Sequence, residues 1–211
     1  MNTYKIVLFG PQGCGKGTQG EKLSDLLNIP LVVTGNIFRR HIKEQTALGK
    51  MAAQFINKGE LVPNEITIKM ISERLQNEDA AKGFILDGFP RSLMQAEALD
   101  KIVKLTHFLL IDISDQESIR RIANRRVCLK CGSTYHLDYK PSKKSGICDR
   151  CQEKLEQRAD DTEEALAKRL KIYHQESEPI LNRYQQQNIV HQINGEQIIE
   201  KVWQDIHKIF S

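Results

Sequence analysis

Short apolar runs alternate along the chain with longer segments in which apolar and polar residues are mixed. Each run has the length of a β-strand and is mostly aliphatic or aromatic, with frequent β-branched residues, which is typical of buried strands. Because strands that alternate with helices form parallel sheets covered on both faces, the pattern predicts an α/β fold with a three-layer, five-stranded parallel sheet. The predicted strands are Ile6–Phe9, Leu31–Val33, Phe84–Leu86, Phe108–Ile113 and Ile189–Ile193.

Three of the intervening segments carry apolar residues at helical spacing. The first covers Lys16–Leu27, and the last carries a stripe of Ile and Val between Ile198 and Ile209. Another helix is predicted to begin at Asp161-Thr162-Glu163-Glu164, where we expect Asp161 to cap the helix and Glu164 to bond back to the cap. The apolar face of that helix is formed by Leu166, Leu170 and Tyr173.

Two segments interrupt the alternation, and we interpret both as insertions into one core. Residues 34–62 show a helical pattern without a strand, and residues 125–161 are rich in Cys, Lys, Gly and Ser without a long periodic run. The expected organisation is a single domain whose core comprises residues 1–33, 63–124 and 162–211.

Composition narrows the class of protein. The chain of 211 residues carries a formal net charge of +4, and nine Lys or Arg against four Asp or Glu lie between Arg125 and Arg158. This concentration of positive charge favours an anionic ligand near that segment. No apolar run is long enough to span a bilayer and no secretion signal is visible, so we expect a cytoplasmic protein without a membrane partner.

A glycine-rich loop, GPQGCGKGT at residues 10–18, follows the first predicted strand and precedes the first predicted helix. Glycines let backbone N–H groups turn toward a ligand, a helix N-terminus attracts anions, and Lys16 adds a positive charge. This context predicts a phosphate-binding loop, although one glycine separates the lysine from Thr18. We interpret Cys14 as a small filler. The candidate ligand-binding residues of the loop are Gly13, Cys14, Gly15, Lys16, Gly17 and Thr18.

A second motif, DGFPR at residues 87–91, ends another predicted strand. Open α/β sheets bind ligands at the carboxyl ends of their strands. Asp87 is therefore a candidate to hold Mg²⁺ through its water shell, and Arg91 is a candidate to clamp a phosphate with its planar guanidinium.

The cysteines indicate a metal site. Four of the five form two CxxC pairs, Cys128 with Cys131 and Cys148 with Cys151, separated by sixteen residues. In a chain without a secretion signal, paired CxxC units favour metal over disulfides, and four thiolates suit a closed tetrahedral Zn²⁺ site with a structural role.

Taken in order, these motifs resemble the adenylate kinases. GPQGCGKGT, TGNIFR, ELV, DGFPR, RRVC and QRADD occur at the spacing of that family over nearly the whole chain, and the cysteines resemble its bacterial long-lid, zinc-containing form. The resemblance implies Mg²⁺-dependent phosphoryl transfer from ATP to AMP, giving two ADP, in a monomer that maintains the adenine nucleotide pool. It also implies that residues 34–62 bind AMP and that residues 125–161 form a zinc-stabilised lid.

The resemblance further implies roles for individual residues. In the AMP site, Gln95 bonds the adenine edge, Thr34 and the segment from Glu60 to Val62 frame the base, and Arg39 and Arg91 hold the phosphate. In the ATP site, Arg125 contacts the phosphates. The remaining implied contacts are Thr134, Tyr135 and Gln197 for ATP, Leu61, Gly88, Phe89 and Pro90 for AMP, and Arg158 and Arg169 between the two nucleotides.

The expected chemistry needs no histidine or cysteine nucleophile, because direct transfer depends on positioning and charge neutralisation. The catalytic candidates are Lys16, Asp87, Arg91, Arg125, Arg158 and Arg169. Two other hypotheses remain open at this point: a zinc-ribbon regulator that binds RNA or DNA through its basic segment, and a kinase for a different nucleoside monophosphate.

Overall fold

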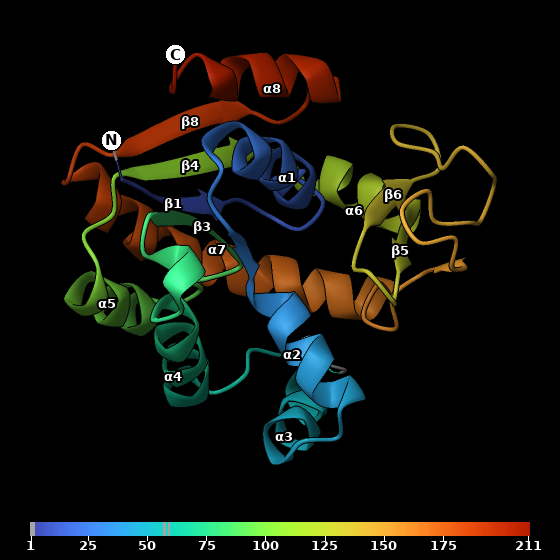
Figure 1. The fold of residues 1–211 in the computed structure, drawn as a ribbon, viewed down its shortest axis with the longest axis horizontal. Helices are drawn as coiled ribbons and strands as arrows, with labels where there is room; N and C mark the ends of the chain where they lie inside the picture. The colour runs from blue at the N-terminus through green and yellow to red at the C-terminus, as the bar shows by residue number, and fades with distance from the viewer. Residues whose placement is uncertain (1–2, 57, 59) are drawn as a thin grey trace.

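A five-stranded parallel β-sheet forms the centre of the molecule (Figure 1). The structure is a computed structural model that describes residues 3–56, 58 and 60–211. The strands lie in the order β2-β3-β1-β4-β8, and every neighbouring pair is parallel. The predicted α/β class and the five predicted strands are confirmed. Their bounds are β1 (Tyr4–Phe9), β2 (Leu31–Val33), β3 (Gly83–Asp87), β4 (His107–Asp112) and β8 (Val190–Asn194).

Helices cover both faces of the sheet and produce three layers. Successive side chains of a strand point to opposite faces, so Ile6 and Leu8 of β1 join one core while Val7 and Phe9 join the other. The first core is closed by α1 (Lys16–Leu27) and α8 (Ile199–His207). The second is closed mainly by α4 (Asn64–Leu75), α5 (Leu93–Ile102) and α7 (Glu163–Gln185).

Both insertions leave the core at the carboxyl edge of the sheet (Figure 1). Residues 34–62 contain α2 (Thr34–Lys43) and α3 (Ala47–Ile56), as the helical pattern predicts; residues 57 and 59 of this segment lie outside the described residues. After α6 (Asp115–Ala123), residues 125–161 form a separate antiparallel sheet in the order β6-β5-β7. Its strands are β5 (Arg125–Cys128), β6 (Thr134–His136) and β7 (Leu155–Glu156), and a short 3-10 helix, η1 (Glu78–Ala80), precedes β3.

The start of α7 differs from the prediction. Thr162, not Asp161, caps the helix, because its side-chain oxygen accepts a hydrogen bond of 3.2 Å from the backbone N–H of Ala165. The Asp161 carboxylate instead binds the guanidinium of Arg125. A two-point contact with a charged guanidinium is stronger than one bond from a backbone N–H group, so the buried carboxylate binds Arg125 and does not cap the helix. Among the described residues, Glu164 makes no bond to the cap.

Within the described ranges, none of the helices is both long enough and apolar enough to cross a membrane.

Candidate functional site

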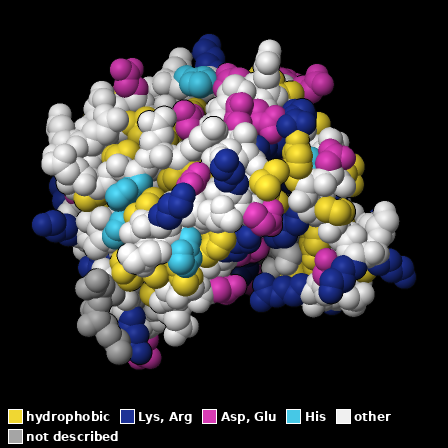
Figure 2. All heavy atoms as spheres, turned by 90° about the horizontal axis from the view of Figure 1, so that it is seen from above, with side chains coloured by type: hydrophobic (Ala, Val, Ile, Leu, Met, Phe, Trp, Pro, Cys, Tyr) yellow, Lys and Arg dark blue, Asp and Glu magenta, His cyan; other side chains and the backbone are white. Residues whose placement is uncertain are grey.

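A cavity of about 1140 Å³ lies at the carboxyl edge of the parallel sheet and is walled by both insertions. Ligands of open α/β sheets bind at this edge. Figure 2 shows Lys and Arg side chains, in dark blue, deep in a hollow of the molecule. The predicted site residues that line the cavity are Gly13, Cys14, Gly15, Lys16, Gly17, Thr18, Thr34, Arg39, Glu60, Leu61, Val62, Asp87, Gly88, Pro90, Arg91, Gln95, Arg125, Thr134, Tyr135, Arg158, Arg169 and Gln197.

Phe89 does not line the cavity. Its side chain is 1% exposed and packs in the core on the α5 side of the sheet. The phenyl ring therefore anchors the turn between Asp87 and Arg91 from behind, while the neighbours of Phe89 in sequence reach the cavity.

The loop between β1 and α1 has the geometry of an anion site. Gly15 stands before α1 with a positive φ of 100° and no side-chain cap, so the first backbone N–H groups of the helix remain available to a ligand. Gly10 is required for packing, since a Cβ atom there would lie 2.1 Å from the carbonyl oxygen of Ile111. The first turn of α1 contains no acidic residue that would repel an anion.

The Lys16 ammonium lies over this loop. It donates hydrogen bonds to the carbonyl oxygens of Gly10 and Pro11 at 2.7 and 2.8 Å, and to Cys14 Sγ at 3.3 Å. Cys14 is thus more than a filler, because its sulfur is one of the three acceptors that position the lysine. The arrangement holds a positive charge beside the free N–H groups of α1.

The predicted arginines converge on the same cavity from separate parts of the chain. Two carboxylates restrain them: Asp161 binds Arg125, and Asp160 Oδ2 lies 3.2 Å from Arg169. The three other predicted arginines, Arg39, Arg91 and Arg158, form no carboxylate ion pair within the described chain. The cluster therefore carries more positive than negative charge.

Burial and mutual repulsion disfavour the charged form of two of these arginines, Arg158 and Arg169. Burial, followed by repulsion from Arg125 and Arg39, lowers the pKa of Arg158 to about 9. Burial also lowers the pKa of Arg169 to about 10, although the Asp160 carboxylate acts in the opposite direction. Because an anion between the guanidiniums would relieve the repulsion, the cluster favours a ligand with several negative charges.

Unpaired polar atoms mark the walls of the cavity. Buried polar groups in proteins are nearly always hydrogen-bonded, yet five buried side-chain atoms of the described residues have no partner in the chain. All five belong to residues that line this cavity, which indicates that a polar ligand completes their bonds. They are Gln12 Oε1, Gln19 Oε1, Thr34 Oγ1, His136 Nε2 and Arg158 Nε.

Gln95 also lines the cavity, and two hydrogen bonds hold its side-chain amide. Its Oε1 accepts from the backbone N–H of Arg91 at 2.8 Å, and its Nε2 donates to Asn64 Oδ1 at 2.8 Å. An amide has two donor hydrogens and two acceptor lone pairs. One Nε2 hydrogen and one Oε1 lone pair therefore remain for a ligand that offers an acceptor next to a donor.

Oxygen ligands suited to Mg²⁺ stand beside the phosphate loop. Asp87 ends β3 and lines the cavity, as does Thr18 in the first turn of α1. Among the described residues, neither side chain forms a hydrogen bond that would occupy its oxygens. Because Mg²⁺ binds carboxylate, hydroxyl, water and phosphate oxygens, the donor set fits this ion.

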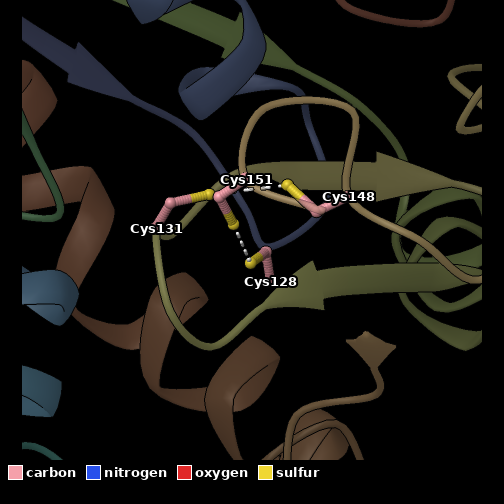
Figure 3. Close-up of side chains that lie close together, drawn as sticks. All are labelled: Cys128, Cys131, Cys148 and Cys151. Atoms are coloured by element: carbon pink, nitrogen blue, oxygen red, sulfur yellow. Dashed lines mark hydrogen bonds between the residues drawn. The ribbon is translucent and has the colours of Figure 1, made fainter. Parts of the chain in front are cut away.

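The four predicted metal ligands come together in the lid (Figure 3). All four sulfur atoms lie within 4.8 Å of one another, with Cys128 to Cys151 at 3.3 Å and Cys131 to Cys148 at 3.5 Å. A tetrahedral site with Zn–S bonds of about 2.3 Å requires sulfur separations of about 3.8 Å, which these positions approach. The donor set therefore fits a thiophilic metal ion.

Two hydroxyl groups lie against this cluster. Tyr135 Oη is 3.5 Å from Cys148 Sγ and accepts from the backbone N–H of Asp149 at 2.8 Å, while Ser133 Oγ is 3.2 Å from Cys131 Sγ. Burial opposes ionisation of the Cys148 thiol, but the bond from Tyr135 and backbone N–H groups lower its pKa overall. The side chain of Tyr135 thus serves the cysteine cluster, although the residue also lines the cavity.

Several contacts within the site carry no signal in the sequence alone. Asn64 lies 31 positions from Gln95, and no local pattern predicts their contact. Arg121 donates to the carbonyl oxygen of Gly195 at 2.9 Å and so joins α6 to the loop that contains Gln197. The QRADD motif names Asp160 and Asp161 but does not reveal that they restrain two arginines.

Comparisons with known proteins agree with this geometry. The family model described as "Adenylate kinase" matches residues 8–189. The chain is 44% identical over 207 residues to an adenylate kinase of Clostridioides difficile (strain 630), with 96% of each chain covered. It is 45% identical to one of Methanocella arvoryzae over 96% of each chain, and 48% identical to one of Ruminiclostridium cellulolyticum over 86% of this chain and 87% of the relative. The chain therefore belongs to the adenylate kinase family.

Proposed function

We propose that this protein transfers the terminal phosphoryl group of Mg-ATP to AMP and forms two ADP, and so balances the adenine nucleotide pool. The observation that carries the proposal is the gathering of the phosphate loop and the arginine cluster in one cavity between two insertions. ATP binds between the loop and the lid, and AMP binds between residues 34–62 and the turn at residues 87–91. The two phosphate tails then meet at the arginine cluster.

The chain contributes positioning and charge. The N–H groups before α1 and the Lys16 ammonium bind the ATP phosphates, and Arg91 and Arg39 bind the AMP phosphate. An oxygen of that phosphate attacks the γ-phosphorus while the bond to the β-phosphate oxygen breaks, so its electron pair leaves with ADP. Arg125, Arg158 and Arg169 oppose the negative charge that spreads over the transferring group.

No side chain needs to act as a covalent nucleophile in this reaction. The competing acceptor is water, so the two insertions must exclude water when both nucleotides are bound. Two contacts link them to the core: Lys140 of the lid lies 3.4 Å from Glu21 of α1, and Lys168 of α7 lies 2.7 Å from Glu60. These contacts favour a covered cavity.

The base of AMP is recognised by the spare donor and acceptor of the Gln95 amide, which match the N1 acceptor and the 6-amino donor of adenine. Thr34 Oγ1, buried without a partner in the described chain, supplies another polar contact in the same pocket, and residues 60–62 frame the base. Thr134, Tyr135 and Gln197 lie on the ATP side.

Two metal ions take part. Mg²⁺ bound with ATP neutralises phosphate charge, and Asp87 and Thr18 are the residues that would hold it and its water shell. The four lid cysteines bind one structural Zn²⁺, because four thiolates leave no open position for a substrate or water. The thiols also require a reducing compartment, which supports a cytoplasmic location.

The deciding experiment is an acceptor screen. Purified protein with Mg-ATP is supplied with AMP, GMP, CMP or UMP, and ADP formation is followed. Rapid turnover with AMP alone is the expected result. Equal turnover with the other monophosphates would contradict the assignment of Gln95 and leave a kinase of different specificity.

We also expect a monomer, and we expect no binding to nucleic acid, since Arg125, Arg150 and Arg158 of the basic segment line the nucleotide cavity. Sedimentation measures the first property. A gel shift with RNA and DNA at low salt measures the second, because electrostatic binding to nucleic acid is strongest there. Retarded bands together with slow turnover would favour the zinc-ribbon alternative.

A further inference from the structure

We infer that Asn64 is a positioning residue that fixes the orientation of the Gln95 amide and thereby makes the acceptor site select an adenine over a 6-oxo purine. The inference deepens the proposed function and rests on it. Asn64 is the first residue of α4, where the chain returns to the core from the insertion at residues 34–62.

The contact network is short and directional. Asn64 Oδ1 accepts two hydrogen bonds, one from Gln95 Nε2 at 2.8 Å and one from Ser92 Oγ at 3.1 Å. Ser92 Oγ in turn accepts from the backbone N–H of Gln95 at 3.3 Å, and the backbone N–H of Arg91 donates to Gln95 Oε1. With 2% of Gln95 exposed, water has little access to replace these bonds.

These partners define which end of the amide is oxygen. If the Gln95 amide turned over, its NH₂ group would face the Arg91 N–H, and its oxygen would face Asn64 Oδ1. Donor would then meet donor and acceptor would meet acceptor, and both hydrogen bonds would be lost. The amide is therefore restricted to one orientation.

The fixed orientation of the Gln95 amide selects between purine bases, because adenine and 6-oxo purines present opposite hydrogen-bond donors and acceptors at N1 and position 6. Adenine offers an acceptor at N1 beside a donor at the 6-amino group, whereas a 6-oxo purine offers a donor at N1 beside an acceptor oxygen. The spare groups of an oriented Gln95 match only one of these patterns. If the amide could turn over freely, it would match both, and the site would lose its preference.

The Arg91 N–H is backbone and cannot change its character, but the Asn64 amide can. Among the described residues, its Nδ2 donates one hydrogen bond, of 3.5 Å, to the weak acceptor Met94 Sδ. If the Asn64 amide turned over, its NH₂ group would face Gln95 in place of Oδ1. That NH₂ group could donate to the oxygen of a Gln95 amide that had also turned over. Aspartate offers acceptors only, so Asn64→Asp should hold Gln95 at least as firmly as the natural residue.

The test compares AMP with inosine monophosphate, which differs only at position 6 and in the proton at N1. We expect Asn64→Leu to lower the ratio of kcat/KM for AMP to that for inosine monophosphate about tenfold, mainly by raising KM for AMP. KM for Mg-ATP should not change, because ATP binds elsewhere. Asn64→Asp should keep or raise the ratio.

Glu65→Leu is the matched control, because it places the same apolar side chain at the next position of α4, where Glu65 is exposed. It should leave the ratio as in the natural protein. An unchanged ratio in Asn64→Leu, or an equal loss in Asn64→Leu and Asn64→Asp, would overturn the inference. Asn64→Ala replaces the leucine variant if that variant does not fold. Failure of the natural protein to use AMP would instead overturn the proposed function.

Discussion

The guanidinium of Arg125 is bound in a two-point contact by the carboxylate of Asp161. Arg125 Nε donates to Oδ2 at 2.9 Å, and a second N–H group bonds the other carboxylate oxygen. Arg125 is the first residue of β5 and Asp161 directly precedes the cap of α7, so the pair joins the two chain passages between the lid and the core. The Asp161 side chain is fully buried, and Arg169 Nη1 lies 4.0 Å from one of its oxygens.

Removing the Asp161 carboxylate should destabilise the protein and slow turnover. Asp161→Ala leaves the Arg125 guanidinium, whose side chain is 14% exposed, without this partner, so we expect a cost at or below the about 3–5 kcal/mol typical of a broken buried pair. Urea unfolding measures the change, and kcat should fall because Arg125 loses its position. Glu153→Gln is the control: it breaks an exposed lid pair of 3.5 Å with Lys130, and exposed pairs contribute about 0–1 kcal/mol. Equal losses of stability in the two variants would contradict the role of the pair.

Anionic ligands should stabilise the fold more than neutral ones of similar shape. The guanidiniums of Arg158 and Arg125 repel each other in the free protein, and a phosphate between them removes that cost. At about 100 times its dissociation constant a ligand adds about 2.7 kcal/mol, or several degrees in Tm. AMP should therefore raise Tm in a thermal scan, and adenosine at the same concentration should not. An equal rise with adenosine would place the binding energy in the base pocket instead.

Loss of the metal site should remove the order of the lid. Among the described residues, the apolar cluster around the cysteines adds Tyr135 and Leu155, and Val127 is buried beside it, which is too little to fold alone. Elemental analysis should find about one zinc per chain, and Cys148→Ser should lower both the zinc content and, by about 5–10 °C, the Tm. Cys14→Ser, at the cysteine outside the cluster, should retain zinc. Metal-free protein with two disulfides would contradict the site.

The Tyr135 hydroxyl should retain the metal. It lies 3.5 Å from Cys148 Sγ and stabilises a thiolate there. Tyr135→Phe removes this bond while keeping the ring, so transfer of zinc to a chromogenic chelator should be about tenfold faster. Thermal unfolding of the zinc-loaded variant serves as the check on folding. Transfer at the natural rate would show that the hydroxyl acts only on the backbone of Asp149.

Acid should weaken the fold through two stacked histidines. The rings of His107 and His191 lie 5.4 Å apart. Burial lowers the pKa of both, and mutual repulsion lowers the pKa of His107 further. The folded state then binds fewer protons than the unfolded state, whose imidazoles titrate near about 6.5, so stability is kept above that pH and falls below it.

Urea unfolding at pH 7.5 and 5.5 measures this loss. Because both rings are partly solvated, the slope should stay below about 1.4 kcal/mol per pH unit for each ring. His191→Gln should flatten the slope, whereas His207→Gln, at the exposed end of α8, should not. Equal slopes in the three proteins would contradict the effect.

Local patterns were sufficient for most of the fold. The apolar runs identify the five strands of the parallel sheet, whereas β5, β6 and β7 of the small sheet were not predicted. The bounds of α1, Lys16–Leu27, are those predicted, because the spacing of its leucines and the glycines before it are local properties. The paired cysteines lie together as expected, and the short sulfur separations of 3.3 and 3.5 Å join the two CxxC units.

Local sequence patterns did not predict contacts between residues that are distant in the chain. Asp161 satisfies the local rule for a helix cap, but Arg125, 36 positions away, attracts its carboxylate more strongly, and Thr162 caps the helix. The contact between Asn64 and Gln95 likewise depends on the packing of α4 against α5, which no local pattern reveals. Phe89 belongs to a binding motif in the sequence, yet its side chain is required by the core.

The bond between Arg125 and Asp161 also has an evolutionary consequence. The ion pair brings the two ends of residues 125–161 together, and the segment has its own small apolar cluster around the cysteines. It can therefore be regarded as a compact unit that is inserted into the core. We expect that its length and its internal bonds could change without rebuilding the parallel sheet, because its strands form a separate sheet. Any such change would have to keep Arg125 and Asp161, because their ion pair closes the base of the segment.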